Sequence, residues 1–291
     1  MKQVTIVGLG MIGASLGLAL KQIKPPPRVI GNDVQYDAAR RAAGLKAVDR
    51  VERDLATAVA GSDLVVIATP IGAIPEVLKA MAGALADGCV VTDTGGTKRE
   101  IVRHAQEILP ATVGFVGGHP MTGPATAGVE KPDASLFHGA VYCLTPLPSA
   151  PPSAIAEVAA MTRQIGARPY FLDPAEHDGL VAGISHLPYV VGSILMKVLS
   201  SEAGWREMSS LAAGGFDAAT RAAAHDPRMF SDVLATNADN VARHLDRLVT
   251  ELSVAKDRLL SGDGILLADL KEAHRRRQEW EDQRRRAKAE G

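Results

Sequence analysis

Residues 2–22 read KQVTIVGLGMIGASLGLALKQ, and this stretch decides the fold. The β-branched run at its start is typical of a buried strand, and the alanine- and leucine-rich run at its end is typical of a helix. Between them lies Gly8-Leu9-Gly10-Met11-Ile12-Gly13, a GxGxxG motif. In such a turn the first glycine permits a tight bend, the second admits a pyrophosphate close to the backbone, and the third lets helix and strand pack closely. The predicted cofactor-binding residues of this turn are Gly8, Gly10, Met11, Ile12 and Gly13.

The second half of a dinucleotide-binding fingerprint follows. Residues 28–32 form another strand-like run, which ends at Asp33, 20 residues after Gly13. A carboxylate at this place accepts hydrogen bonds from ribose hydroxyls and repels a 2′-phosphate. No arginine occurs among the next three residues, so the sequence predicts NAD rather than NADP as the cofactor.

Strand-like and helical runs continue to alternate up to residue 172, and the remainder is helical in pattern. This order predicts an α/β fold: a Rossmann-like, doubly wound, mostly parallel sheet followed by an all-α C-terminal domain. We expect a nucleotide-binding domain at residues 1–172 and a helical substrate and dimerisation domain at 173–291. The further predicted strands are 63–68, 89–93, 112–116, 140–144 and 168–172, and the predicted helices between them include 74–85, 98–108 and 153–165.

Composition narrows the class of protein. The formal net charge is −1, from 32 Lys and Arg against 33 Asp and Glu, which gives no reason to expect a nucleic-acid partner. The hydrophobic fraction of 46% is that of a soluble globular protein, and no membrane association is expected. The only cysteines are Cys89 and Cys143, which predict free thiols in a reducing cytoplasm. No Cys or His spacing predicts a metal site.

Polar residues follow three of the predicted strands. In an open parallel sheet ligands bind at the carboxyl ends of the strands, so these residues should converge near the nicotinamide end of the cofactor. Thr69 and Pro70 follow one strand and Asp93 ends the next, and these three are predicted to bind the cofactor. The segment 117–123 follows the predicted strand 112–116 and holds His119.

His119 is the candidate catalytic residue. It stands between Gly118 and Pro120, which places it on a constrained turn just after a strand. A neutral imidazole suits removal of a hydroxyl proton while hydride leaves the same carbon. We expect the other histidines considered to be surface or packing residues: His104, His138, His177, His225, His244 and His274.

The helical half contributes further candidates. Ser185 and His186 directly precede the helix that starts near Pro188, and Arg221 follows a glycine-rich break. An arginine facing a cleft could hold a carboxylate through two parallel hydrogen bonds, but spacing alone favours a surface ion pair for Arg221. The apolar helix faces at 187–199 and 241–260 would suit a homodimer or packing within one chain.

At this point the chain resembles the prephenate/arogenate dehydrogenase family of tyrosine biosynthesis. The resemblance runs through the chain in order and is most specific where a GGHPM run is followed by SHLP and then by GGF and TR. The matching stretches are GLGMIG with Asp33, ATPI at 68–71, VTDTGGTK at 91–98, GGHPMTGPATAG at 117–128, ISHLPY at 184–189 and GGFDAATRAAAHDPRMF at 214–230.

The resemblance implies an NAD-dependent oxidative decarboxylation of prephenate or arogenate. It implies that His119 polarises or deprotonates the ring hydroxyl and that Arg221 holds a substrate carboxylate. Ser185 and His186 would line the substrate pocket, and a homodimer would form through the helical domain.

The chain departs from the family pattern in three ways. Gly96 stands where the family has a serine that helps to orient the hydroxyl, and Thr97 or a water molecule is expected to take that role beside Gly96. Pro124, Ala125 and Thr126 supply no acid after the histidine turn, and Tyr189 replaces a second histidine. These departures leave the choice between prephenate and arogenate open.

Two other functions stay open. A dehydrogenase of the β-hydroxyacid type shares the architecture but uses a lysine of the C-terminal domain as its catalytic residue. A regulator that senses NAD without turnover is the alternative from another class. The missing serine at Gly96 keeps it open, whereas the presence of His119 and Arg221 argues against it.

Overall fold

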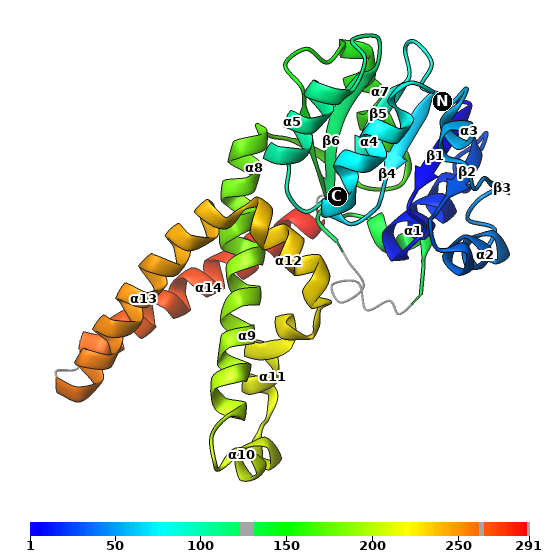
Figure 1. Cartoon of the computed structure of the whole chain (residues 1–291). Coiled ribbons are helices and arrows are strands. Elements are labelled where there is room, and N and C mark those ends of the chain that lie inside the picture. Colours follow the sequence, from blue (N-terminus) through cyan, green and yellow to red (C-terminus); the bar gives the residue numbers. More distant parts are fainter. Residues whose placement is uncertain (123–130, 262–264, 290–291) are drawn as a thin grey trace. The chain divides into compact units, whose positions relative to one another are not determined.

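The computed structural model describes residues 1–122, 131–261 and 265–289 (Figure 1). Contacts divide the chain into two compact units, Met1–Asn237 and Ala238–Gly291, and each is described by itself. Pro124, Ala125 and Thr126, expected to supply no acid to the site, lie outside the described residues.

Within the described residues, eight strands form one sheet in the order β3-β2-β1-β4-β5-β6-β7-β8. Neighbouring strands are parallel except β6 and β7, so the predicted mostly parallel, doubly wound sheet is confirmed. The order reverses beside β1, and this reversal is where such sheets bind nucleotides. The strands are β1 Gln3–Val7, β2 Arg28–Asn32, β3 Arg50–Val51, β4 Leu64–Ile67, β5 Val90–Asp93, β6 Gly114–Pro120, β7 Val141–Pro146 and β8 Arg168–Phe171.

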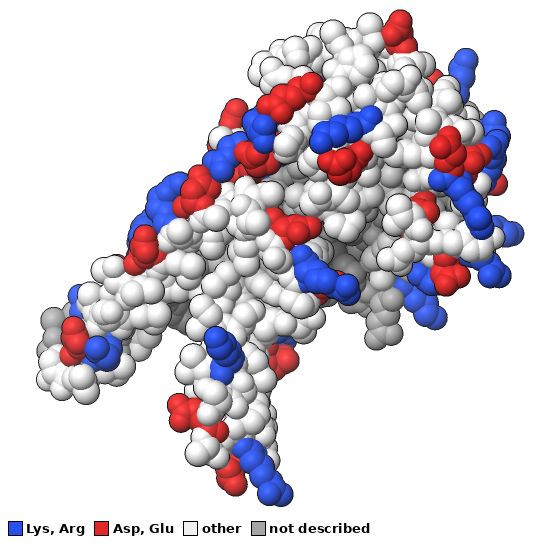
Figure 2. Space-filling model, in the orientation of Figure 1, with Lys and Arg blue, Asp and Glu red and all other residues white. Residues whose placement is uncertain are grey.

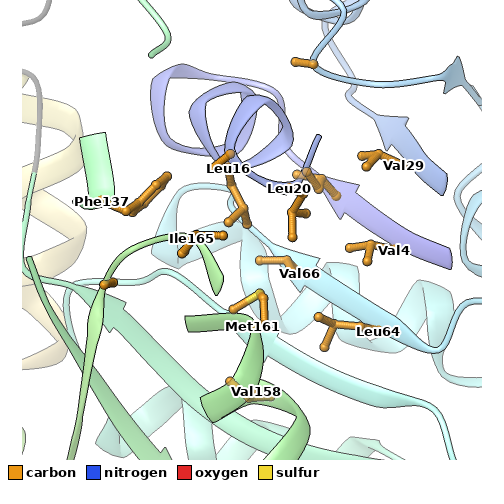
Figure 3. Close-up of a cluster of buried hydrophobic side chains, with 14 of the residues drawn as sticks. Val4, Leu16, Leu20, Val29, Leu64, Val66, Phe137, Val158, Met161 and Ile165 are labelled. Atoms are coloured by element: carbon orange, nitrogen blue, oxygen red, sulfur yellow. The ribbon is translucent and has the colours of Figure 1, made fainter. Parts of the chain in front are cut away.

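Helices cover both faces of the sheet because alternate strand residues point to opposite sides. Leu64 and Val66 of β4 belong to one apolar cluster, whereas Val65 and Ile67 belong to the other. Figure 3 shows the first cluster, in which helix and strand side chains interdigitate. One face is covered by α1 Met11–Leu20, α2 Tyr36–Gly44 and α7 Pro152–Gln164, and the other by α3 Leu55–Val59, α4 Ile74–Ala82 and α5 Arg99–Ile108.

Strand β6 is longer than the sequence predicts. The expected strand ended at residue 116 with His119 on a turn, but Gly117 to Pro120 continue the strand and pair antiparallel with β7. The prediction was wrong because β7 supplies ladder partners that no local pattern reveals. A Cβ atom at Gly117 would meet the side chain of Thr145, so the glycine pair reflects close packing rather than a turn.

The structure becomes helical after β8, as predicted. Asp173 caps helix α8 by accepting from the N–H groups of Ala175 and Glu176, and Pro174 takes the first helical position. The helices of this part of the first unit are α8 Pro174–Val181, a π-helical turn Ala182–His186, α9 Leu187–Ser200, α10 Trp205–Leu211, α11 Gly214–Thr220 and α12 Pro227–Thr236. Short 3-10 turns lie at Ile71–Ala73, Ala134–Phe137 and Arg221–Ala224.

The run Pro174–Ser200 is one continuous apolar helix. Within the described residues it alone is long and apolar enough to cross a membrane by length and composition, a test that core helices of soluble proteins also pass. Its first turns carry the buried side chains of His177 and Asp178, and Asp178 accepts from the backbone at the start of α5. This end of the helix is therefore packed against the sheet.

The second unit is a pair of helices, α13 Ala238–Ser261 and α14 Ile265–Ala289. An ion pair between Arg258 and Asp269 joins them. Helix α14 carries its own pairs one turn apart, such as Arg277 with Glu281 at 2.6 Å. Basic and acidic side chains are interspersed over the face of the molecule that Figure 2 shows.

Candidate functional site

The glycine-rich turn has the backbone geometry that a dinucleotide needs. Gly8 has φ +94°, and a Cβ atom there would lie 2.6 Å from backbone at the end of β4. A Cβ atom at Gly13 would collide with the carbonyl oxygen of Gly8, so α1 packs directly on the turn. At Gly10 a Cβ atom would meet no atom of the described residues within 4 Å, so none of them crowds the N-terminus of α1 at this point. That terminus begins at Met11, has no side-chain cap and has no acid in its first turn. It can therefore receive an anion.

Two polar groups beside this turn fit the rest of an NAD molecule. The Asp33 carboxylate accepts from the N–H groups of Leu9 and Gln35, both at 2.7 Å, which fixes it at the end of β2. Each of its oxygens retains a lone pair for a ribose hydroxyl. Thr69 follows β4, and its buried Oγ1 has no hydrogen-bond partner among the described residues. Such an orphaned hydroxyl at the mouth of a nucleotide crevice suits a cofactor contact. Pro70 follows Thr69 and is exposed.

Asp93 is wholly buried and organises the next strand end. Its Oδ2 accepts from Gly95 N at 2.7 Å, its Oδ1 accepts from Gly118 N at 3.0 Å, and its carboxylate is ion-paired with Lys98. The Lys98 ammonium also donates to the carbonyl oxygen of Gly118 at 2.7 Å. Burial lowers the pKa of Lys98, and the nearby Asp93 carboxylate opposes that shift. Asp93 and Lys98 together fix β6 against the loop that follows β5.

His119 projects from β6 into a hydrogen-bonded chain of buried groups. Its Nδ1 lies 2.9 Å from Nε2 of His177, and Nδ1 of His177 lies 2.8 Å from Oδ1 of Asp178. The Asp178 carboxylate also accepts from the backbone N–H groups of Lys98 at 2.7 Å and Arg99 at 2.9 Å. The two imidazole rings meet edge to face, with their centroids 5.1 Å apart. This chain of contacts links the first helix after the sheet to the candidate base.

The surroundings keep His119 neutral. Removal of water from around the ring lowers its pKa well below 6.5, and the nearby His177, Lys98 and His186 add to the effect. A histidine with a lowered pKa is unprotonated at neutral pH and can accept a proton.

Gly96 and Thr97 lie next to His119 in different ways. A Cβ atom at Gly96 would lie 4.0 Å from Nε2 of His119 and 3.5 Å from a methyl group of Val233, so Gly96 and Nε2 of His119 are near neighbours. The Thr97 hydroxyl is buried and hydrogen-bonds to Oγ1 of Thr236 at 2.8 Å. Gly96 therefore lies beside Nε2, the ring nitrogen of His119 that does not contact His177, whereas the Thr97 hydroxyl is held by Thr236 of α12.

His186 and Ser185 lie in the π-helical turn, a distortion that is frequent at functional sites. His186 is buried, and burial lowers its pKa to about 4, with His177 adding to that shift and Asp178 opposing it. Its Nδ1 lies 3.2 Å from the amide nitrogen of Asn237, which also donates to the backbone carbonyl of Asp178 at 2.8 Å. Ser185 is partly exposed. His186 is thus joined to the His119 chain through Asn237.

Arg221 lies apart from this cluster. It follows α11, its side chain is 66% exposed, and it is paired with Asp217 at 2.6 Å. Among the described residues, this pair is the contact that the structure gives its guanidinium.

Sequence reasoning did not assign a role to Lys98, His177, Asp178 or Asn237. His177 was expected to be a surface or packing residue, and it is fully buried in contact with His119. One signal was available: His177 and Asp178 begin a helix in which residues 179–196 contain no Asp, Glu, Lys or Arg. Titratable neighbours at the start of so apolar a helix indicate a buried polar site.

Two family models match almost the whole chain. The one described as prephenate dehydrogenase, nucleotide-binding domain, matches residues 16–171, and the one described as prephenate dehydrogenase, dimerization domain, matches residues 173–271. This chain belongs to the prephenate dehydrogenase family. The resemblance found in the sequence motifs is thereby confirmed.

Similar proteins agree with this membership. A prephenate dehydrogenase of Bacillus subtilis is 33% identical over 86% of this chain and 68% of its own length. A cyclohexadienyl dehydrogenase of Zymomonas mobilis is 33% identical over 95% of each chain. The crystal structure of the Aquifex aeolicus prephenate dehydrogenase with hydroxyphenyl propionate and NAD+ has a TM-score of 0.86 at 26% identity, covering 96% of this chain and 98% of that one. Together with the turn geometry, these relatives show that this family member is an NAD-dependent oxidoreductase.

We expect Asp33→Ala to narrow the preference of this dehydrogenase for NAD over NADP by about 10- to 100-fold. A hydrogen bond to a charged group contributes about 1.5–3 kcal/mol, and each 1.4 kcal/mol is about tenfold. The measurement is the ratio of kcat/KM values for the two cofactors. Asp37→Ala, in the exposed first turn of α2, is the matched control. An unchanged ratio would mean that Asp33 does not contact the ribose of the cofactor.

Proposed function

We propose that this enzyme oxidises prephenate, arogenate or both, with loss of CO₂, giving 4-hydroxyphenylpyruvate or tyrosine. The observation that carries the proposal is His119, held through Nδ1 by His177 at the carboxyl edge of the sheet, with Nε2 on the side of Gly96. A neutral base at that place suits a substrate whose reacting carbon bears a hydroxyl.

His119 Nε2 accepts the ring hydroxyl proton as hydride leaves the carbinol carbon, which becomes a ketone. NAD+ supplies the hydride acceptor. The ring carboxylate then leaves as CO₂, and the electron pair of the broken bond moves through the ring to the ketone oxygen. Return of a proton to that oxygen completes the phenol. Because the ring becomes aromatic, the reaction is effectively irreversible.

We assign the turn at Gly10, Asp33 and Thr69 to the cofactor, with Pro70 and Asp93 shaping its nicotinamide end. Support comes from the uncapped start of α1, the fixed carboxylate and the orphaned hydroxyl. We assign Gly96, Ser185 and His186 to the substrate pocket. Thr97 acts through its position beside Gly96, because Thr236 engages its hydroxyl.

Arg221 is assigned to a substrate carboxylate. Its pairing with Asp217 is exposed and one turn apart, and such pairs contribute only about 0.3–0.5 kcal/mol. Breaking the Asp217 pair to bind a substrate carboxylate therefore costs little free energy. The guanidinium would hold the substrate carboxylate through two parallel hydrogen bonds.

We expect Arg221→Ala to raise the KM for the cyclohexadienyl substrate about 10- to 100-fold while kcat changes less, because a binding contact is lost rather than the base. Steady-state kinetics at saturating NAD+ measure both constants. Arg228→Ala removes a nearby arginine whose side chain is 95% exposed, and it should leave KM unchanged. An effect of Arg221→Ala on thermal stability alone would make Arg221 a structural residue.

The helical part supports a homodimer. On the helix Pro174–Ser200, large apolar side chains recur at a spacing of three and four residues, and several of them are exposed. The most exposed are Leu180, Ile184, Ile194 and Val198. Helix α13 has a similar exposed set in Val249, Leu252 and Leu259. A second copy would remove these faces from water, and light scattering in solution gives the mass that tests it.

A cytoplasmic location is part of the proposal. Cys89 and Cys143 are free and buried. Burial raises the pKa of Cys89 to about 12, so this thiol is unreactive. Free buried thiols are typical of reducing compartments.

The experiment that tests the function is NADH formation with NAD+ and, separately, prephenate and arogenate. Turnover of either substrate supports the proposal, and the ratio of the two kcat/KM values identifies the preferred one. No turnover of either, with NAD+ binding intact, would favour a dehydrogenase of another substrate class or an NAD-binding sensor.

A further inference from the structure

We propose that His177 and Asp178 form a positioning pair that holds His119 as its Nδ1–H tautomer and so leaves Nε2 free to act as the base. The inference rests on the proposed function for its consequence in catalysis, but the tautomer itself is a property of the folded chain. Neither residue touches the space beside Gly96, so both act through His119.

The direction of each hydrogen bond from Asp178 through His177 to His119 follows from the groups that donate to Asp178. Backbone N–H groups can only donate, so those of Lys98 and Arg99 require the Asp178 carboxylate to accept. Oδ1 of the same carboxylate lies 2.8 Å from Nδ1 of His177, which must then carry the hydrogen and donate. A neutral His177 therefore has its lone pair on Nε2.

The same logic passes to His119. Nε2 of His177 is now an acceptor, and it lies 2.9 Å from Nδ1 of His119. Nδ1 of His119 must donate, and in the neutral ring this leaves the lone pair on Nε2. That nitrogen lies on the side of Gly96, 4.0 Å from where a Cβ atom of residue 96 would stand. The chain of contacts thus selects the one neutral tautomer that can take a proton from a hydroxyl placed there.

The carboxylate at the end of the chain is well held. Asp178 is wholly buried and lies at the N-terminus of the ten-residue helix α5, where the helix dipole favours negative charge. Asn237 donates to its backbone carbonyl at 2.8 Å, which ties the start of α8 to the end of α12. The negative charge of Asp178 can therefore stabilise an imidazolium at His119, with His177 between the two.

This support matters once His119 has accepted the proton. Burial of the ring disfavours a positive charge there, and the nearby His177, Lys98 and His186 add to that effect. Transfer of the Nδ1 proton of His119 to Nε2 of His177 would move that charge next to the Asp178 carboxylate. The pair then acts as the aspartate of a hydrolase triad does, by orienting the imidazole and stabilising the imidazolium, with one further histidine in between.

Because Gly96 stands where the family pattern has a serine, His177 and Asp178 become the main restraint on the His119 ring. Within the part of the chain that the structure describes, His177 is the hydrogen-bond partner of His119, and no side chain of residue 96 lies on the other edge. A ring held from one edge only depends on that contact for its orientation.

The first test is the tautomer of His119 in the full chain with saturating NAD+, read from ¹⁵N shifts and couplings of labelled histidine. The His119 signals are assigned by their loss in His119→Asn. We expect His119 and His177 both to be Nδ1–H tautomers. An Nε2–H tautomer of His119 would overturn the proposal whatever the substrate proves to be, so its failure is distinguishable from failure of the proposed function.

The second test compares His177→Phe with His177→Gln. Phe fills the buried site without a hydrogen bond, so kcat should fall about 10- to 100-fold, the loss found when the hydrogen-bond partner of a metal-binding histidine is removed. The KM for NAD+ should stay constant, and the His119 signals should shift toward the Nε2–H tautomer. Gln offers a carbonyl acceptor to Nδ1, so it should retain the tautomer and more of the activity. His138→Phe, an exposed histidine, is the control. Equal activity of the Phe and Gln variants, with no change of tautomer, would overturn the proposal.

Discussion

His119→Asn is expected to lower kcat by about 10²- to 10⁴-fold, the range that general acid–base catalysis contributes. The asparagine amide can still donate to His177, so the variant keeps the buried contact and removes the basic lone pair. Binding of NAD+, measured by fluorescence titration, should be unchanged because the base lies outside the glycine-rich turn. In the unsubstituted enzyme kcat/KM should stay level as pH falls to 6.5 and decline only below it. The reason is that the neutral base persists until pH reaches the lowered pKa of His119.

The control for this variant is His104→Asn, on helix α5 away from the cluster, which should leave kcat within a factor of about two. Retention of full kcat in His119→Asn would remove His119 from the mechanism. If NAD+ binding were lost and kcat fell at the same time, the substitution would have disrupted the folded structure of the site.

The glycine-rich turn and the acid at Asp33 could be predicted from sequence because the features that define them are local. A strand, three glycines, a helix and one carboxylate lie within 33 residues, and each has its own backbone requirement. The positive φ of Gly8 and the close approach at Gly13 are the structural form of that pattern.

The surroundings of His119 could not be predicted in the same way. Its partner His177 is 58 residues away, and the contact exists only because α8 packs against α5. The length of β6 depended on pairing with β7, which no run of residues around Gly117 reveals. Local periodicity says which face of an element is buried, whereas the identity of the group across the interface is a property of the assembled fold.

The buried ion pair between Lys98 and Asp93 is the basis of the largest stability effect we expect. Both side chains are fully excluded from solvent. Lys98→Met should fill the space but leave the Asp93 carboxylate with only the N–H groups of Gly95 and Gly118. Removing one member of a buried pair costs about 3–5 kcal/mol because the other charge stays desolvated. The expected result is a loss of that size in the free energy of unfolding, measured by urea denaturation.

The control is Lys79→Met, which removes an exposed lysine paired with Glu76 one turn away and should cost less than about 1 kcal/mol. The double variant Asp93→Asn/Lys98→Met separates charge from packing. Its neutral amide needs no cation, so it should be more stable than Lys98→Met alone, although one backbone N–H loses its acceptor. If the double variant were instead the less stable of the two, the pair would act through shape rather than charge. An effect of Lys98→Met as small as that of Lys79→Met would mean that the Asp93 carboxylate is solvated or neutral in the folded chain.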